Sequence, residues 1–155
     1  MLMPPLSGCN EIGDTKKIKV TIKGANSKRA HQVWQTAQSF TQKITIQKDV
    51  VIGDNCKVQS HAFICELVTI GNDCFIGHGV MFVNDLFSMG GPARGNKDLW
   101  KSTKIGNNVS IGSNATILPV TICDKVVIGA GAVVTKNITE PGIYAGNPAK
   151  KIRNL

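Results

Sequence analysis

The chain has 155 residues with 42% hydrophobic and 18% charged residues, so it is long enough for one domain with a substantial core and too apolar for a disordered protein. The net charge is +8, but the lysines and arginines are scattered, without aromatic-interleaved strands or a basic helix. This pattern argues against a nucleic-acid partner and favours small polyanionic ligands or a solvated basic surface.

No apolar run approaches the roughly 20 residues that a membrane-spanning helix needs. The opening MLMPPLSGCNEIGD has no basic lead and no useful apolar stretch, so we do not expect a secretory signal. A cytoplasmic protein that does not engage a membrane is therefore expected. Because no export signal is expected, the five cysteines are predicted to be thiols, and the lack of any CxxC spacing argues against a zinc–cysteine site.

Residues 1–30 follow no regular pattern, although KIKVTIKG alternates as a strand does. We expect this segment to be irregular and to precede a β-helix domain over residues 31–139, whose first coil is loosely built. A loop over residues 86–104 interrupts that domain. Residues 140–155, rich in Gly, Pro and basic residues, are expected to form a cap and tail that cover an open strand edge.

The middle of the chain has a repeat with a period of six residues, here called the beat. The large apolar residues on this beat are Ile52, Val58, Ile64, Ile70, Ile76, Phe82, Ile105, Ile111, Ile117, Ile122, Ile128 and Val134. The residue after each of these apolar residues is often Gly, and the residue four places after it is small or β-branched. Such a period is typical of an all-β parallel β-helix, in which three hexapeptides form a triangular coil of about eighteen residues. Cys56 and Cys74 should therefore stack in successive coils and point inward, as buried packing residues or as a metal or redox pair.

Two irregularities break the beat. Ile117 and Ile122 are five steps apart, and Cys123 stands where Gly is usual, so the coil must tighten there. The other break is the loop over residues 86–104, and a loop of this length in a compact repeat is usually functional. It contains Arg94, Lys97, Asp98 and Trp100 and should project from the coil.

One full turn of the coil, here called a lap, takes about eighteen residues, so residues eighteen apart are predicted to lie side by side. Ser60 and His78 share one register, and Glu66 shares another with Asn84. His61 follows Ser60, and Asp85 follows Asn84, so all six should gather on neighbouring corners beside the loop. Taken singly, each is compatible with an ordinary turn or a solvated surface. As a set, held by a rigid scaffold, they indicate a site.

The chain resembles the left-handed β-helical hexapeptide-repeat acyltransferases, and most closely the nucleotide-linked 3-amino-sugar N-acetyltransferases of bacterial surface-polysaccharide pathways such as O-antigen lipopolysaccharide synthesis. The stretches that carry the resemblance are VWQTAQ (33–38), VQSHAFICELVTI (58–70), IGHGVMFVND (76–85), IGSNATILP (111–119), VVIGAGAVVTKNI (126–138) and AGNPAKKIR (145–153). The MFVND stretch, followed by a long loop, is what narrows the resemblance to enzymes for dTDP- or UDP-sugars. Leu67 departs from it, since Gly is frequent at that place in similar proteins.

The resemblance implies a cytoplasmic homotrimer that uses acetyl-CoA and no metal, with sites between subunits. It implies catalytic roles for His78, Asn84 and Asp85. The substrate would be bound by Ser60, His61, Glu66, Arg94 and Trp100, and the acetyl-CoA by Gly112, Ser113, Ala130, Pro148, Lys150 and Arg153.

Acyl transfer from a thioester to an amine fits these residues. Asp85 can orient the amine, and the Asn84 amide or a backbone N–H can stabilise the oxyanion. His78 can accept the released proton, although the departing CoA thiolate takes it in some similar enzymes. Lys150 and Arg153 suit the phosphates of CoA.

Three alternatives remain open from the sequence. Some trimeric β-helices are carbonic anhydrases with three shared histidine ligands, and this chain has His31, His61 and His78, but without the His-x4-His spacing of those enzymes. The coil could also serve as a non-catalytic scaffold. Finally, the acyl acceptor could be serine, a hydroxyl sugar or another small amine.

Overall fold

Short strands alternate with turns along the chain in this computed structural model, which describes residues 21–22 and 44–155. The strands are β1 (Thr21–Ile22), β2 (Thr45–Ile46), β3 (Val51–Ile52), β4 (Lys57–Val58), β5 (Phe63–Ile64), β6 (Val68–Ile70), β7 (Phe75–Ile76), β8 (Met81–Phe82), β9 (Thr103–Ile105), β10 (Ser110–Ile111), β11 (Thr116–Ile117), β12 (Thr121–Ile122), β13 (Val126–Ile128), β14 (Val133–Val134), β15 (Gly142–Ala145) and β16 (Lys150–Arg153). From β3 to β14, each strand ends on a buried large apolar residue of the beat, because successive side chains of a strand point to opposite faces and one of them faces the core.

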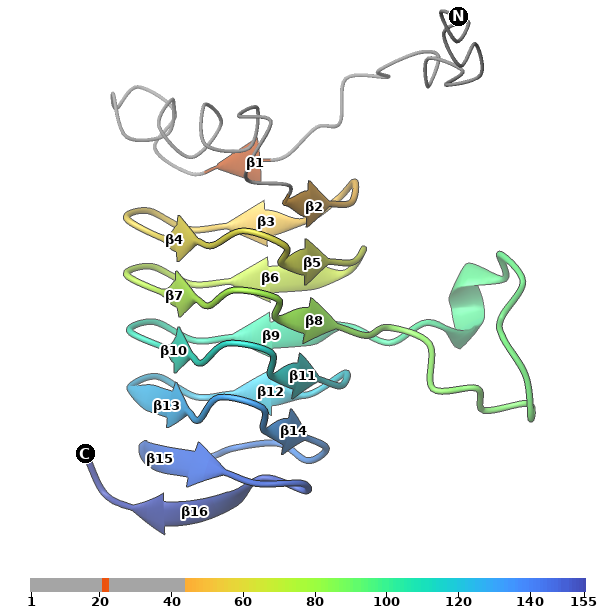
Figure 1. Cartoon of the computed structure of the whole chain (residues 1–155). Coiled ribbons are helices and arrows are strands. Elements are labelled where there is room, and N and C mark those ends of the chain that lie inside the picture. Colours follow the sequence, from red (N-terminus) through yellow and green to blue (C-terminus); the bar gives the residue numbers. More distant parts are fainter. Residues whose placement is uncertain (1–20, 23–43) are drawn as a thin grey trace, which may run out of the picture.

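Three sheets form the sides of a left-handed parallel β-helix (Figure 1). Sheet A contains β1, β3, β6, β9 and β12, sheet B contains β2, β5, β8, β11 and β14, and sheet C contains β4, β7, β10, β13, β15 and β16. The pairings between coils are parallel, and the hairpin of β15 and β16 is antiparallel. The predicted fold class is therefore confirmed.

The core is a single apolar column inside the three sheets. Every large apolar residue on the predicted beat is buried, from Ile52 to Val134. Cys56 and Cys74 are buried in successive coils, as predicted, and their thiols contact the carbonyl oxygens of Gly71 at 3.0 Å and Gly106 at 3.2 Å. A hydrogen bond between the two thiols lowers the pKa of Cys56 to about 7 and raises the pKa of Cys74.

The turns from sheet A to sheet C are joined by a ladder of amide and carboxylate side chains. Asn72 Oδ1 accepts from Asp54 N at 2.8 Å, Asn107 Oδ1 from Asn72 N at 2.9 Å, and Asp124 Oδ1 from Asn107 N at 2.7 Å. The backbone hydrogen bond from Asn107 holds the pKa of Asp124 below its ordinary value. At this corner the Asn and Asp residues therefore have the structural role that is common in turns.

The lap length changes along the helix. Side-chain contacts between adjacent coils span 18 residues before the loop, 35 across it and 17 after it. The shorter lap confirms the predicted tightening, since Ile105 pairs with Ile122 and Ser110 with Val127. The missing residue is thus absorbed without losing register.

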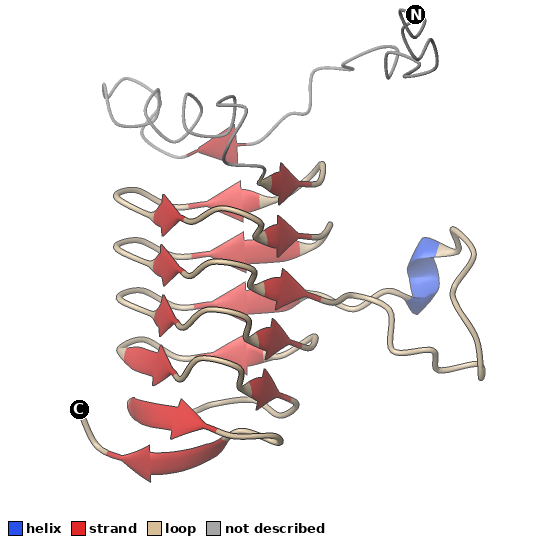
Figure 2. Cartoon of the chain, viewed as in Figure 1, coloured by secondary structure: helices blue, strands red, loops and turns tan. Residues whose placement is uncertain are grey.

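The loop leaves the coil after β8 and returns at β9 (Figure 1). Over the described residues, the helical structure is one 3-10 turn within this loop, η1 (Lys97–Leu99) (Figure 2). Asn96 caps η1, because its side chain accepts a hydrogen bond from Asp98 N. The loop therefore has some structure of its own where it projects from the β-helix.

The chain ends in the β15–β16 hairpin, which continues sheet C beyond β13. Lys151 pairs with Glu140 at 2.8 Å across the outside of this hairpin. The coil expected to begin after Ala30 falls largely on residues 31–43, outside the described residues. No helix in the described part of the chain is long and apolar enough to span a membrane.

Candidate active site

The β-helix has three corners, and at each corner the turns of successive coils stack into a column. Two of these corners contain the residues selected from the sequence. The turns from sheet C to sheet B, here named the histidine corner, comprise residues 59–62, 77–80, 112–115 and 129–132. The turns from sheet B to sheet A, here named the loop corner, comprise residues 47–50, 65–67, 83–102 and 118–120. The short strands of sheet B separate the two corners.

Backbone hydrogen bonds stack the histidine corner into one column. Gly79 N donates to Ser60 O at 3.0 Å, and Asn114 N donates to His78 O at 2.7 Å. One coil further along, Gly131 N donates to Ser113 O at 2.8 Å. Equivalent residues of successive coils are therefore direct neighbours along this corner.

Ser60 and His78 touch, as the lap arithmetic predicted. Ser60 Oγ lies 2.8 Å from His78 Nδ1, within hydrogen-bond distance. The His78 side chain is exposed, and within the described residues Nε2 has no hydrogen-bond partner. An imidazole held by one nitrogen offers the other as a proton donor or acceptor.

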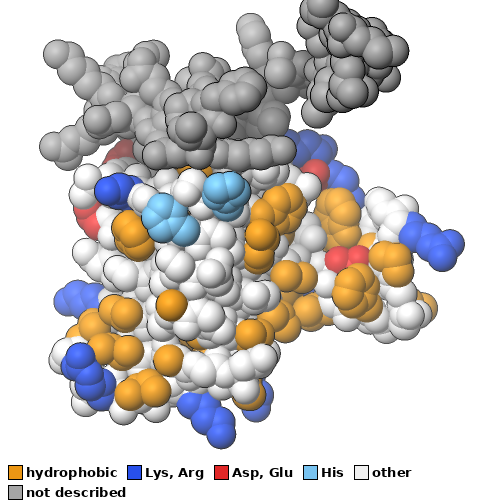
Figure 3. All heavy atoms as spheres, viewed as in Figure 1, with side chains coloured by type: hydrophobic (Ala, Val, Ile, Leu, Met, Phe, Trp, Pro, Cys, Tyr) orange, Lys and Arg blue, Asp and Glu red, His pale blue; other side chains and the backbone are white. Residues whose placement is uncertain are grey.

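His61 lies beside this pair, on the same corner. Its φ is 63°, in the left-handed region, and its side chain is exposed. The outward residues of the flanking strands are apolar: Phe75 on β7 is 39% exposed and Met81 on β8 is 44% exposed. Both described histidines lie on one face with hydrophobic side chains on either side (Figure 3). Phe75 and Met81 were not among the residues expected at the site, although their outward place on the beat could have identified them.

The residues expected to bind acetyl-CoA continue the histidine corner. Gly112 must lack a side chain, because a Cβ there would lie 2.5 Å from Ala130 N. Below Ala130, Val133 N donates to Gly146 O at 3.0 Å and Ala149 N donates to Val133 O at 2.8 Å. The turn that holds Pro148 thus extends the same line of turns.

The C-terminal basic residues lie on the last strand. Lys150 and Arg153 bound β16, and both are exposed. Pro148, two residues earlier, is exposed as well. These three residues are therefore accessible at the end of sheet C that is nearest to Ala130.

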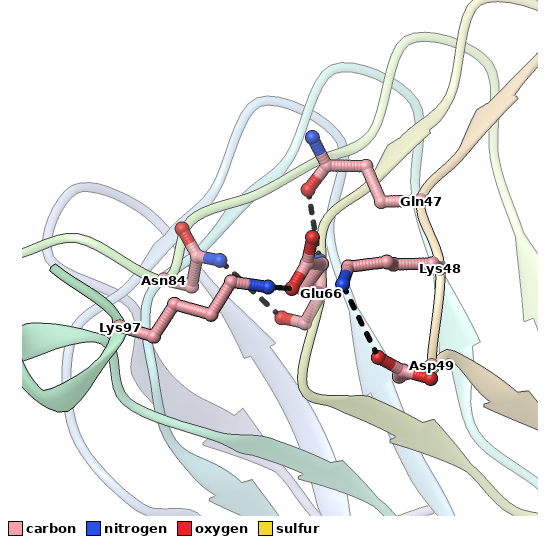
Figure 4. A network of polar contacts seen from close by, with 6 residues as sticks. All are labelled: Gln47, Lys48, Asp49, Glu66, Asn84 and Lys97. Carbon is pink, nitrogen blue, oxygen red and sulfur yellow. Dashed lines mark hydrogen bonds and ion pairs between the residues drawn. The ribbon is translucent and has the colours of Figure 1, made fainter. Parts of the chain in front are cut away.

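The loop corner contains the second predicted pair. Asn84 Nδ2 donates to Glu66 O at 3.4 Å, so these residues are neighbours as predicted, through the main chain of Glu66. The Glu66 carboxylate binds Lys97 Nζ at 2.7 Å, and Gln47 Oε1 accepts from Glu66 N at 2.9 Å (Figure 4). Beside this network, Lys48 Nζ lies 4.0 Å from the Asp49 carboxylate (Figure 4).

Lys97 links the coil to the aromatic residue of the loop. Its Nζ lies 5.3 Å from the ring centroid of Trp100, which is half-buried. The hydrogen bond to Glu66 raises the pKa of Lys97 above its ordinary value. Glu66 and Trp100 were expected at the site, but no role was predicted for Lys97, because a loop has no repeat that would identify its partner 31 residues away.

Asp85 organises the base of the loop. Its Oδ1 accepts from Phe87 N at 2.9 Å and its Oδ2 from Ala93 N at 2.7 Å. Each carboxylate oxygen retains a second lone-pair site, so the group is fixed in orientation and still able to accept from a ligand. Arg94 follows the buried Ala93, with a φ of 50° and an exposed side chain.

One chain does not bring the two corners together. His78 and Asn84 are separated by the turn and by β8, six positions of chain that span at most about 20 Å. Ser60, His61 and His78 therefore form one group, and Glu66, Asn84, Asp85 and the loop form another. A ligand that touches His78 and Asp85 of the same chain would have to cross sheet B.

The zinc alternative requires three ligands. In residues 44–155, no three His, Cys, Asp or Glu side chains are grouped so that they could hold a metal ion. His61 and His78 are neighbours, but His31 lies outside the part of the chain that the structure describes. The described residues alone do not supply the set of ligands that this alternative needs.

Comparison with known proteins identifies the repeat. Residues 102–136 match a family model described as the hexapeptide repeat of succinyl-transferase. The galactoside O-acetyltransferase of Escherichia coli is 40% identical over 90 residues, which are 57% of this chain and 44% of the relative. The chain spans about half the length of the first curated relatives it matches.

Solved structures agree on the fold. A hexapeptide-repeat acetyltransferase from Vibrio cholerae, complexed with acetyl-CoA, has a TM-score of 0.60 at 23% identity and covers 84% of this chain and 80% of its own. Perosamine N-acetyltransferase from Caulobacter crescentus, complexed with CoA and GDP-perosamine, has a TM-score of 0.57 at 23% identity. That match covers 70% of this chain and 44% of the enzyme.

Proposed function

We propose that this hexapeptide-repeat β-helix is an acetyl-CoA-dependent N-acetyltransferase that acts on the amino group of a nucleotide-linked sugar. The sugar would be a dTDP- or UDP-linked 3-amino sugar of a surface-polysaccharide pathway. The acetyltransferase names of the matched proteins support the reaction type. The perosamine N-acetyltransferase supports the acceptor class, because its structure contains GDP-perosamine, a nucleotide-linked amino sugar.

The observation that carries the proposal is the position of His78. It is an exposed imidazole, hydrogen-bonded through Nδ1 and mounted on a rigid column of turns. The same column continues through Gly112, Ser113 and Ala130 towards the basic C-terminal strand. A thioester bound along this column would place its acyl group near a fixed base, with its phosphates near Lys150 and Arg153.

The reaction needs few groups. The amine nitrogen attacks the thioester carbonyl, a C–N bond forms, the C–S bond breaks, and the amine proton passes to His78 Nε2 or to the departing CoA sulfur. Asp85 orients the amine as a hydrogen-bond acceptor. The Asn84 amide or a backbone N–H stabilises the developing oxyanion. Ser60, His61, Glu66, Arg94 and Trp100 line the path of the sugar nucleotide.

The separation of the two corners supports a site between subunits. The histidine corner of one copy and the loop corner of the next would complete one site in a homotrimer. The exposed Phe75 and Met81 beside the histidine corner, and Phe87 and Met89 on the loop, are apolar surfaces that a second copy would cover. A cytoplasmic location fits a substrate pair of acetyl-CoA and a sugar nucleotide.

Ligand-induced stabilisation tests this function. Acetyl-CoA and a dTDP- or UDP-linked amino sugar should each raise the unfolding temperature of the full chain, because each binds the native state. Acetyl transfer to the amine, followed by release of free CoA thiol, should require both. If neither class of ligand stabilises the protein and no thiol is released, the proposal is wrong.

A second candidate is acetylation of a hydroxyl group. The galactoside O-acetyltransferase, at 40% identity, favours it, since its name specifies an oxygen acceptor. A hydroxyl depends more strongly on a base such as His78 than an amine does, because it must lose its proton to become a good nucleophile. Comparing an amino sugar with its hydroxyl analogue in the same thiol-release assay separates the two acceptors.

A further inference from the structure

The main chain of His78 is fixed from both neighbouring coils. Asn114 N donates to His78 O at 2.7 Å, and Gly79 N donates to Ser60 O at 3.0 Å. Gly79 itself lies in the left-handed region at φ 65°, and the space a side chain would take there is occupied by the Asn114 side chain. Only the side-chain torsions of His78 are left free by the backbone.

The His78 ring is exposed, so packing does not hold those torsions. The contact that restricts them in the described structure is the one between Ser60 Oγ and Nδ1, at 2.8 Å. Ser60 belongs to the turn of the adjacent coil and is half-buried, which makes it a fixed anchor. A single hydroxyl therefore sets both the direction of the ring and the environment of one ring nitrogen.

We infer that Ser60 is a positioning residue that accepts a hydrogen bond from Nδ1–H of His78 and so leaves the Nε2 lone pair facing the substrate. This role rests on the proposed function, because it has catalytic meaning only if His78 takes a proton. It adds to the contact with the substrate that the resemblance implies for Ser60.

The direction of the hydrogen bond follows from the proton transfer. Nδ1 carries a proton both in the neutral tautomer with a free Nε2 and in the imidazolium, so Ser60 Oγ can accept in both states. The bond becomes charge-assisted when Nε2 gains the amine proton, which stabilises the ring most strongly after transfer. The opposite arrangement, with Ser60 donating to Nδ1, would put the proton on Nε2 and remove the base.

Long-range proton–nitrogen NMR of histidine-labelled full-length protein tests the inference without any assay of activity. The signals of His78 are assigned by their loss in His78→Gln. We expect wild type to show the Nδ1–H tautomer, Ser60→Ala to show a mixture, and Ser60→Thr to keep the wild-type signals because it retains a hydroxyl. Ser110→Ala, a matched substitution on the outward face of β10, should change nothing. A wild-type Nε2–H tautomer, or no change in Ser60→Ala, would overturn the inference.

Kinetics supplies the second readout. Ser60→Ala should lower kcat about five- to tenfold, as expected for the loss of one neutral hydrogen bond, with KM for acetyl-CoA unchanged and Ser60→Thr restoring most of the rate. An unchanged kcat in Ser60→Ala contradicts the positioning role. If wild type transfers no acetyl group to any acceptor, the proposed function fails, whereas the NMR experiment still decides the Ser60–His78 pairing.

Discussion

The fourth place of each regular hexapeptide lies in the left-handed region of backbone conformation. The residues there are Asp49, Asn55, His61, Leu67, Asp73, Gly79, Asn108, Asn114, Lys125 and Gly131, with φ between 55° and 69°. Asn, Asp and Gly tolerate this conformation at little cost, and His is also enriched in it. Leu67 and Lys125 do not share this preference, so these turns are held by the coils around them.

Leu67 gives a stability prediction. A bulky residue in the left-handed region costs about 1–2 kcal/mol, and its side chain is 39% exposed. We expect Leu67→Asn to raise the free energy of unfolding by about 0.5–1 kcal/mol, measured by urea denaturation. Leu86→Asn, also at an exposed leucine, should give no gain. A less stable Leu67→Asn would mean that the side chain's contacts outweigh the backbone cost.

Cys65 gives a pH prediction. Burial raises the pKa of its thiol from an ordinary 9.0 to about 11. As the pH rises, this thiol ionises in the unfolded chain before it ionises in the folded chain. Its contribution to the free energy of unfolding is therefore fully present below pH 9 and is lost as the pH rises towards 11. Between pH 8 and pH 10 the loss from this thiol should be about 1.3 kcal/mol, measured by urea unfolding at each pH. Cys65→Ala should be less stable at neutral pH but show a flatter dependence, whereas Cys123→Ala, nearer the surface, should keep most of the slope.

At the scale of the element, the loop is an insertion that the coil can do without. Its ends are closed by Lys101 N donating to Asn84 O at 2.9 Å and by Thr103 N donating to Leu67 O at 3.1 Å. Thr103 is buried at the place that small residues occupy in other coils. The hexapeptide beat therefore resumes directly at β9, and the loop contributes surface and not core.

Deleting residues 86–102 should leave the helix folded. The deletion joins Asp85 to Thr103 and reduces the lap from 35 to 18 residues, the length found in the coils before the loop. We expect an unfolding temperature within a few degrees of wild type, retained stabilisation by acetyl-CoA, and loss of acceptor-dependent thiol release.

Deleting residues 86–105 is the matched control. It also removes β9, whose Thr103 and Ile105 are buried in the core and whose backbone links β6 to β12 in sheet A. This variant should be strongly destabilised or fail to fold. If both deletions unfold alike, the loop contributes to the core of the helix after all.

At the scale of the whole molecule, the proposed site takes one half from each of the two corners. If each site takes His78 from one copy and Asp85 from the next, two inactive variants can complement each other. We expect His78→Ala and Asp85→Asn chains, each poorly active alone, to recover about a quarter of wild-type activity when they are assembled from an equal mixture, since about a quarter of the interfaces then hold two intact halves.

Light scattering should give the mass of a trimer for wild type and for both variants. Recovery requires subunits to exchange, so the mixture is co-refolded from urea, with each variant refolded alone as the control. No recovery, with trimers present, would place both halves of the site in the same chain and would contradict a site between subunits.

The sequence alone determined the coil. An aliphatic residue at every sixth place has few ways to be buried, and the stacking of Cys56 on Cys74 and of Ser60 on His78 follows from the lap length without any knowledge of side-chain contacts. Even the shortened lap was predictable, because the missing residue lies between Ile117 and Ile122 in the printed chain.

The tertiary structure decided what the loop and the turn side chains do. It showed that Glu66 pairs with Lys97, that the Asp85 carboxylate is held by two loop N–H groups, and that His78 and Asn84 lie on different corners. A repeat fixes positions only where its period holds. An insertion has no register, and the rotamer of an exposed side chain depends on partners that are distant in sequence, so these contacts appear only once the chain is folded.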